Sequence, residues 1–198
     1  LSIRRQRQMC IRDRTSLEEI DYLHEAASAE RFRENFAGDA RVDAPEIVWE
    51  RSTRRVLTLS DVTAIKINDT DALRAAGIDP SEVADVFAGG MFDQVFTHSF
   101  VHADPHPGNI FVTPEPASAT GRNFRLTFID FGMMAEVPDN LRDGLRTLLI
   151  AVAGRDSRGL VTAAQEIGVL LPSADTAELE RALRALFARF GGMGFAEL

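Results

Sequence analysis

The feature that most constrains this chain is a pair of polar motifs placed around short apolar segments. The first motif, at residues 102–109, reads His-Ala-Asp-Pro-His-Pro-Gly-Asn and lies between an apolar segment with helical spacing and the apolar run 110–113. The second, Asp-Phe-Gly at 130–132, directly follows the apolar run 126–129. Pro105 and Pro107 fix φ and stiffen the first motif. The simplest alternative is a helix-to-strand connection whose polar residues only cap and turn the chain.

The spacing of these motifs matches the catalytic loop of protein kinases. Asp104 and Asn109 are five residues apart, as in H-R-D-x-x-x-x-N, and Asp-Phe-Gly follows in kinases too. Phosphoryl transfer from ATP requires an aligned acceptor and neutralised phosphate charge. We predict that Asp104 accepts the acceptor's proton or orients a water, with Asn109 as the second catalytic residue. Asn109 and Asp130 offer oxygen ligands that suit Mg²⁺, and Gly132 allows a sharp bend after the ligand.

Several segments together resemble the UbiB/AarF family of atypical protein-kinase-like proteins. The resemblance rests on HADPHPGNIF and FIDFGMM around the two motifs, on EIDYLHEA at 19–26, on PEIVW at 45–49 and on VLTL at 56–59. It covers roughly residues 15 to 190. It implies a protein-kinase-like fold with ATP and Mg²⁺ as cofactors.

The resemblance also assigns residues to the nucleotide. Glu25 would be the helix glutamate that pairs with the ATP-binding lysine, and Glu19 and Asp21 would form an additional acidic motif near the nucleotide. Residues 58–62, with Leu59 and Asp61, would form the hinge that contacts adenine. From the sequence alone, the three acidic residues of the helix are equally compatible with a solvated helix face.

The function implied is that of an ATP-binding atypical kinase or ATPase that supports ubiquinone biosynthesis. Expected partners are ATP and, through the resemblance, lipids or quinone-biosynthesis proteins at the cytoplasmic face of a bacterial membrane. One alternative is a small-molecule kinase of the aminoglycoside or choline type, whose catalytic loop is similar. Others are a catalytically silent pseudokinase and a metal hydrolase that uses His102, Asp104 and His106, although such a centre needs a further ligand.

The remaining pattern predicts an α+β layout. Helical spacing begins at the capping box Ser16-x-x-Glu19 and continues to about Phe36. We expect a hairpin from 46–50 and 55–60, a loop over 100–109 and a strand pair from 110–113 and 125–129. Helices are expected at 71–76, 80–98, 138–154, 157–168 and 176–191.

The net charge and the cysteine count exclude two further properties. A formal net charge of −8 argues against a nucleic-acid partner, and the single cysteine, Cys10, cannot form an internal disulfide.

We expect an arginine-rich leader foreign to the domain at 1–14, the remnant of an N-terminal lobe at 15–62 and a truncated catalytic lobe at 63–198. Lys66 follows Glu25 and is predicted to be a surface lysine. With the nucleotide lysine upstream of the chain, we expect little activity from this segment alone.

Overall fold

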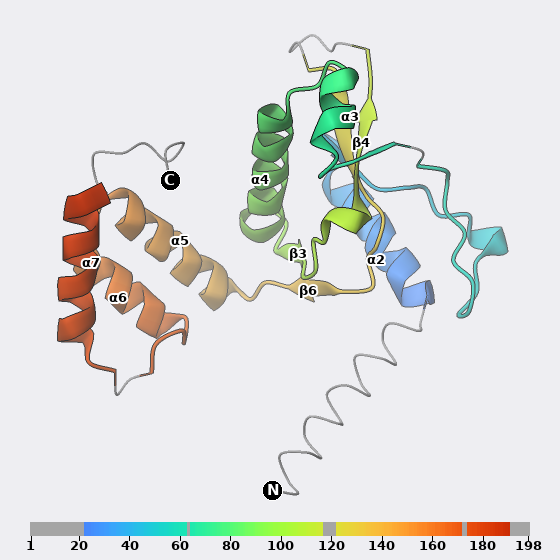
Figure 1. Cartoon of the computed structure of the whole chain (residues 1–198). Helices are drawn as coiled ribbons and strands as arrows, with labels where there is room; N and C mark the ends of the chain where they lie inside the picture. The colour runs from blue at the N-terminus through green and yellow to red at the C-terminus, as the bar shows by residue number, and fades with distance from the viewer. Residues whose placement is uncertain (1–21, 63, 117–121, 172–173, 191–198) are drawn as a thin grey trace, which may run out of the picture. The chain divides into compact units, whose positions relative to one another are not determined.

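The computed structural model describes residues 22–62, 64–116, 122–171 and 174–190 (Figure 1). These residues form two compact units that divide between Glu136 and Val137. Strands from both sides of the predicted border at 62/63 join one sheet of the first unit. The predicted leader with Cys10, and the predicted nucleotide residues Glu19 and Asp21, lie outside the described residues.

A four-stranded sheet of order β1-β5-β4-β2 forms the centre of the first unit. The predicted pair is present as β4 (Ile110–Pro114) and β5 (Phe124–Phe128), which are antiparallel. The sequence did not reveal the two outer strands, which are only two residues long: β1 (Val42–Asp43), parallel to β5, and β2 (Ile65–Lys66), antiparallel to β4. Lys66 is exposed, as predicted.

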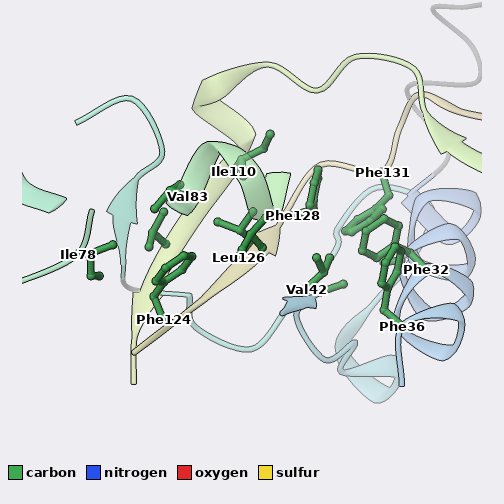
Figure 2. Close-up of a cluster of buried hydrophobic side chains, with 14 of the residues drawn as sticks. Phe32, Phe36, Val42, Ile78, Val83, Ile110, Phe124, Leu126, Phe128 and Phe131 are labelled. Atoms are coloured by element: carbon green, nitrogen blue, oxygen red, sulfur yellow. The ribbon is translucent and has the colours of Figure 1, made fainter. Parts of the chain in front are cut away.

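The hydrophobic core of this unit packs on one face of the sheet (Figure 2). Side chains alternate along a strand, so Phe124, Leu126 and Phe128 of β5 point into the core while Arg125 between them is only half-buried. The helix α2 (Tyr22–Asn35) adds Phe32, whose ring lies 5.1 Å from that of Phe131. The core therefore reaches the Asp-Phe-Gly motif itself.

Two helices precede the first polar motif. α3 (Thr70–Ala75) is capped by Asp69 and ends before Gly77, which has a φ of +73° that favours glycine. α4 (Pro80–Phe96) is capped by the carboxylate of Asp79, which accepts a hydrogen bond from the Ser81 N–H. Both helices confirm the sequence predictions to within two residues.

The predicted loop over 100–109 contains regular structure that the sequence did not indicate. Its first residues form β3 (Phe100–His102), which pairs with β6 (Met134–Glu136) in a second, antiparallel sheet. Its last residues form a 3₁₀ turn at Pro107–Asn109. The loop prediction was wrong at these positions because β3 is short and its partner lies beyond the Asp-Phe-Gly motif.

The hairpin predicted at 46–60 is paired less regularly than a ladder. Ile47 and Leu59 form an isolated antiparallel bridge. Beyond it the hydroxyl of Ser52 replaces ladder bonds, since it donates to the carbonyl of Val48 at 2.9 Å and accepts from the Thr58 N–H at 3.0 Å. The intervening residues form a 3₁₀ turn at Trp49–Arg51, so continuous strands were a wrong prediction there.

The second unit consists of the three predicted helices. They are α5 (Asp139–Ala153), α6 (Ser157–Glu166) and α7 (Thr176–Phe190). α6 contacts both of the others, and its N-terminus is capped by Asp156, whose carboxylate accepts from the N–H groups of Arg158 and Gly159. In the part of the chain that the structure describes, no helix combines the length and apolar character needed to cross a membrane.

Candidate functional site

A cavity of about 420 Å³ brings together the side chains that the two motifs carry. α2 contributes Glu25, the loop after β3 contributes Asp104 and Asn109, and the segment after β5 contributes Asp130. The other lining residues are Tyr22, His102, Ile129, Gly132 and Met133. Four predicted site residues from three separate segments of the chain therefore share one cavity.

The carboxylate of Asp130 is held by donors on both oxygens. The Asn109 side-chain amide donates from Nδ2 to Oδ2 at 3.0 Å, and the Gly132 N–H donates to Oδ1 at 3.0 Å. Each carboxylate oxygen has a further lone pair, and the amide oxygen of Asn109 is left available because its nitrogen faces Asp130. The pair thus presents hard oxygen donors, which Mg²⁺ prefers while it keeps its remaining ligands from water and phosphate.

The chain bends at Gly132, as predicted, without adopting a left-handed backbone there. Its φ is not in the left-handed region, where Gly77 and Gly168 lie. A Cβ at position 132 would lie 3.4 Å from Oδ1 of Asp130 and 3.9 Å from Oε2 of Glu25, both ordinary contact distances. The N–H group of Gly132 in addition orients the Asp130 carboxylate.

His102 connects the backbones of the two motifs from a buried position, with 2% of its surface exposed. The Asp104 N–H donates to Nδ1 at 3.3 Å, so Nδ1 is an acceptor and Nε2 carries the hydrogen that is donated to the Asp130 carbonyl. Burial lowers the pKa of His102. A neutral imidazole with a fixed tautomer therefore braces the loop, as expected of a scaffold residue.

The 3₁₀ turn at Pro107–Asn109 fixes the position of Asn109. Nδ1 of His106, an exposed residue, accepts from the Gly108 N–H at 3.0 Å and so caps the turn. The Asn109 N–H donates to the His106 carbonyl at 2.9 Å, and the Asn109 carbonyl accepts from the Ile129 N–H at 3.0 Å. Asn109 is thereby attached to the residue that precedes Asp130. Asp104 is exposed, which leaves its carboxylate accessible to an acceptor.

Glu25 points to the Asp-Phe-Gly motif. Its Oε1 accepts a long hydrogen bond, 3.5 Å, from the Phe131 N–H. Partial burial, and to a smaller degree the negative charge of Asp130, raises the pKa of Glu25. Lys66, the one lysine of the sequence, does not line the cavity. A cation brought to this cavity would relieve the repulsion between the two carboxylates.

Of the two predicted hinge residues, Asp61 lines a different cavity, whereas Leu59 does not line it. Leu59 is half-buried and packs against the core, and Asp61 lines a space of about 210 Å³ together with Ser60, Val62 and Thr127. Thr127 and Ile129 are two residues apart at the end of β5, and Ile129 lines the cavity of Asp130. Both cavities therefore open beside the same stretch of chain.

Sequence reasoning missed one buried residue that supports the site. Gln94 in α4 is fully buried, and its Oε1 accepts from the His102 N–H at 2.9 Å. Helical spacing from Val83, Val86 and Gly90 places position 94 on the buried face of α4, so this periodicity was the available signal. A buried amide on that face needs a partner, and the motif backbone provides it.

Among the described residues, no group of three or more His, Cys, Asp and Glu side chains is arranged to hold a metal ion by itself. A hydrolytic metal centre at His102, Asp104 and His106, the alternative that the sequence left open, would need such a group. His102 is in addition engaged on both ring nitrogens. The Asn109–Asp130 pair is the donor set that fits a metal whose other ligands come from a substrate.

Comparisons with known proteins identify a family for this chain. The model of the ABC1 atypical kinase-like domain matches residues 10–164. The chain is 39% identical over 164 residues to Protein ACTIVITY OF BC1 COMPLEX KINASE 8, chloroplastic, of Arabidopsis thaliana, covering 83% of this chain and 21% of the relative. It is 38% identical over 170 residues to an uncharacterised protein of Synechocystis, covering 86% of this chain and 29% of that protein.

A solved structure shows the same fold. It is a Mycobacterium tuberculosis protein in complex with erythromycin, matched with a TM-score of 0.63 and 21% identity over 88% of this chain and 42% of that one. The chain spans between a fifth and a third of the length of the first curated relatives it matches.

Proposed function

Because the chain belongs to the ABC1 atypical kinase-like family, the UbiB/AarF family predicted from its sequence, we propose that it carries the catalytic loop and metal site of an ATP-dependent phosphotransferase or ATPase. The α+β, protein-kinase-like fold is confirmed with the family. The observation that carries the proposal is the convergence of Glu25, Asp104, Asn109 and Asp130 on one cavity.

In this proposal each side chain has a distinct task. Mg²⁺, when bound, neutralises charge on the phosphates. Asp130 and the amide oxygen of Asn109 hold the metal, and the Gly132 N–H keeps the carboxylate oriented. Asp104 accepts the proton of an acceptor hydroxyl or of a water. His102 stays neutral and keeps the backbones of Asp104 and Asp130 at a fixed separation.

The nucleotide residues complete the proposal. The hinge residues Leu59 and Asp61 would contact adenine, and the location of Asp61 at a cavity that Thr127 also lines supports this. Glu19 and Asp21 would lie near the nucleotide, as the family resemblance implies. Glu25 would pair with a lysine supplied by sequence upstream of α2, as the family resemblance implies, and its place in the cavity beside Asp130 supports this.

The direct test uses the natural full-length protein that contains this chain, with Mg²⁺ and ATP. We expect Asp130→Asn to lower turnover by about 100-fold, since it removes a charged metal ligand while preserving shape. Asp71→Asn is the matched control, because this carboxylate is 98% exposed on α3, and it should leave turnover unchanged. Normal Mg²⁺-dependent ATP hydrolysis by Asp130→Asn would refute the proposal.

For the biological role we propose support of quinone biosynthesis at a membrane surface, on the cytoplasmic side of a bacterial cell. This rests on the family resemblance, and the comparisons themselves include chloroplast proteins. Deleting the gene in its host should lower the quinone content, and a plasmid copy should restore it, whereas a copy with Asp130→Asn should not. Unchanged quinone content after deletion would argue against this role.

A small-molecule phosphotransferase is the second candidate. It is favoured by the solved neighbour that binds erythromycin and by the exposure of Asp104. Mass spectrometry after incubation with ATP and a panel of aminoglycosides, choline and erythromycin would reveal a phosphorylated product. A pseudokinase would instead show a nucleotide-dependent rise in Tm with neither hydrolysis nor transfer.

A further inference from the structure

Arg31 joins α2 to the two-stranded sheet of β3 and β6. Its guanidinium forms two hydrogen bonds to the Glu136 carboxylate, one from Nη1 to Oε1 and one from Nη2 to Oε2 at 3.1 Å. The same guanidinium lies over the Phe100 ring, 4.0 Å from its centroid. Phe100 and Glu136 are register partners in the ladder, so Arg31 contacts both strands at one pair of residues.

The two strands of this sheet are adjacent in the chain to the two motifs of the site. β3 ends at His102, two residues before Asp104, and β6 begins at Met134, two residues after Gly132. The Ala103 N–H also donates to the Met133 carbonyl at 2.8 Å. A contact that holds α2 to this two-stranded sheet therefore restricts how far Glu25 can move from the backbone of the Asp-Phe-Gly motif.

The remaining packing of α2 is uneven along its length. Its buried residues near Glu25 are small, namely Ala26, Ser28 and Ala29, whereas Phe32 and the following Phe36 provide aromatic packing toward the other end. Small side chains bury little apolar area and so contribute little to holding a helix in place. The buried positions near Glu25 thus contribute little to holding this end of α2, and the hydrogen bond from Phe131 is long.

We propose that Arg31 is a positioning residue for the site: it clamps α2 to the β3–β6 sheet and so holds Glu25 beside Asp130. The catalytic effect rests on the proposed function, but the clamp itself does not. Two favourable contacts at one side chain, an ion pair and a cation–π contact, together correspond to about a tenfold change in the population of the docked helix.

The experiment compares Arg31→Gln and Glu136→Gln in the natural full-length protein. Both positions are exposed, with side-chain exposures of 43% and 64%, so we expect both variants to fold. We expect kcat for ATP hydrolysis to fall about tenfold, with KM for ATP changed less than about twofold, because the contacts of Arg31 to Glu136 and Phe100 involve no residue of the predicted adenine hinge at 58–62. Arg74→Gln, which breaks the exposed pair with Asp71, is the matched control and should retain full activity.

Hydrogen exchange provides a readout that does not depend on catalysis. Amides of α2 should exchange about tenfold faster in Arg31→Gln, while those of α4 stay at the wild-type rate. A merely structural role would accelerate both helices together and would overturn the proposal, as would unchanged exchange in α2. Arg31→Lys, which keeps the charge without the paired donors, should give an intermediate rate.

The charge-swapped double variant, Arg31→Glu with Glu136→Arg, tests the pair itself. It should recover part of the activity and part of the protection lost in Arg31→Glu alone, and failure to recover either would refute the clamp. If the wild-type protein shows no ATP turnover, the proposed function fails while the exchange comparison still decides whether Arg31 holds α2.

Discussion

Replacing His102 with phenylalanine isolates the two hydrogen bonds by which this residue braces the site. The substitution preserves an aromatic ring between Phe128 and Phe131, whose centroids lie 5.8 and 6.0 Å from that of His102. It removes the acceptor for the Asp104 N–H and the donor for the Asp130 carbonyl. The effect is therefore one of lost polar contacts in a nearly unchanged core.

The expected loss in the free energy of unfolding follows from the burial of the Asp104 N–H and the Asp130 carbonyl. A buried donor or acceptor left without a partner costs about 1–3 kcal/mol. Both partners are only partly buried, so the lower half of that range applies to each, and the free energy of unfolding should fall by about 2–4 kcal/mol. That loss is a large share of the roughly 5–15 kcal/mol by which a domain is stable.

Urea unfolding followed by tryptophan fluorescence measures the free energy of unfolding of the first unit, which contains His102. Trp49 is the only tryptophan of the sequence and lies in the first unit, 41% exposed, with its indole N–H donated to Glu30. His24→Phe is the matched control because His24 is exposed on α2. A change within about 0.5 kcal/mol for His102→Phe, or an equal loss for His24→Phe, would refute the reasoning.

Two further predictions concern stability. The pKa of His102 in the folded protein lies below its ordinary value of 6.5, so between these two values the unfolded chain binds more protons and the free energy of unfolding should fall as pH decreases below about 6.5. The difference in this free energy between wild type and His102→Phe, measured by urea unfolding at several pH values, should shrink over the same pH window. A difference that stays constant with pH would contradict the prediction. A methyl group at Gly144 in α5 would lie 2.0 Å from Cγ2 of Ile167, so Gly144→Ala should destabilise the protein by about 1–2 kcal/mol despite its better helix propensity. Thermal unfolding by circular dichroism checks this against Gly38→Ala, where the methyl meets nothing within 4 Å, and equal Tm values for the two variants would contradict the packing argument.

The parts of the fold that the sequence predicted are those determined by local chemistry. α3 and α4 begin at Asp69 and Asp79, whose carboxylates cap the first turns, and α3 ends before a glycine with positive φ. The β4–β5 pair follows from two apolar runs close together in the chain. In each case the residues that specify the structure lie within a few positions of it.

The parts that escaped prediction depend on contacts between distant segments. β3 is a strand only because residues 134–136 return beside it, and Val42–Asp43 is a strand only because β5 lies alongside. The grouping of Asp104, Asn109 and Asp130 followed from motif spacing, whereas the roles of Gln94 and Arg31 depend on tertiary neighbours that periodicity alone does not identify.

The attachment of α2 to the sheet has a mechanical consequence. Phe36 is buried at the end of the helix, and β1 follows within a few residues and is hydrogen-bonded to β5, which makes this end a pivot. Glu25 lies eleven residues before Phe36, or about 16 Å away along a helix that rises about 1.5 Å per residue. A tilt of about 10° at the pivot therefore swings the Glu25 end of this lever by about 3 Å, the full length of a hydrogen bond. Small rotations at the base of α2 are thus amplified into making or breaking the contact between Glu25 and the Asp-Phe-Gly motif.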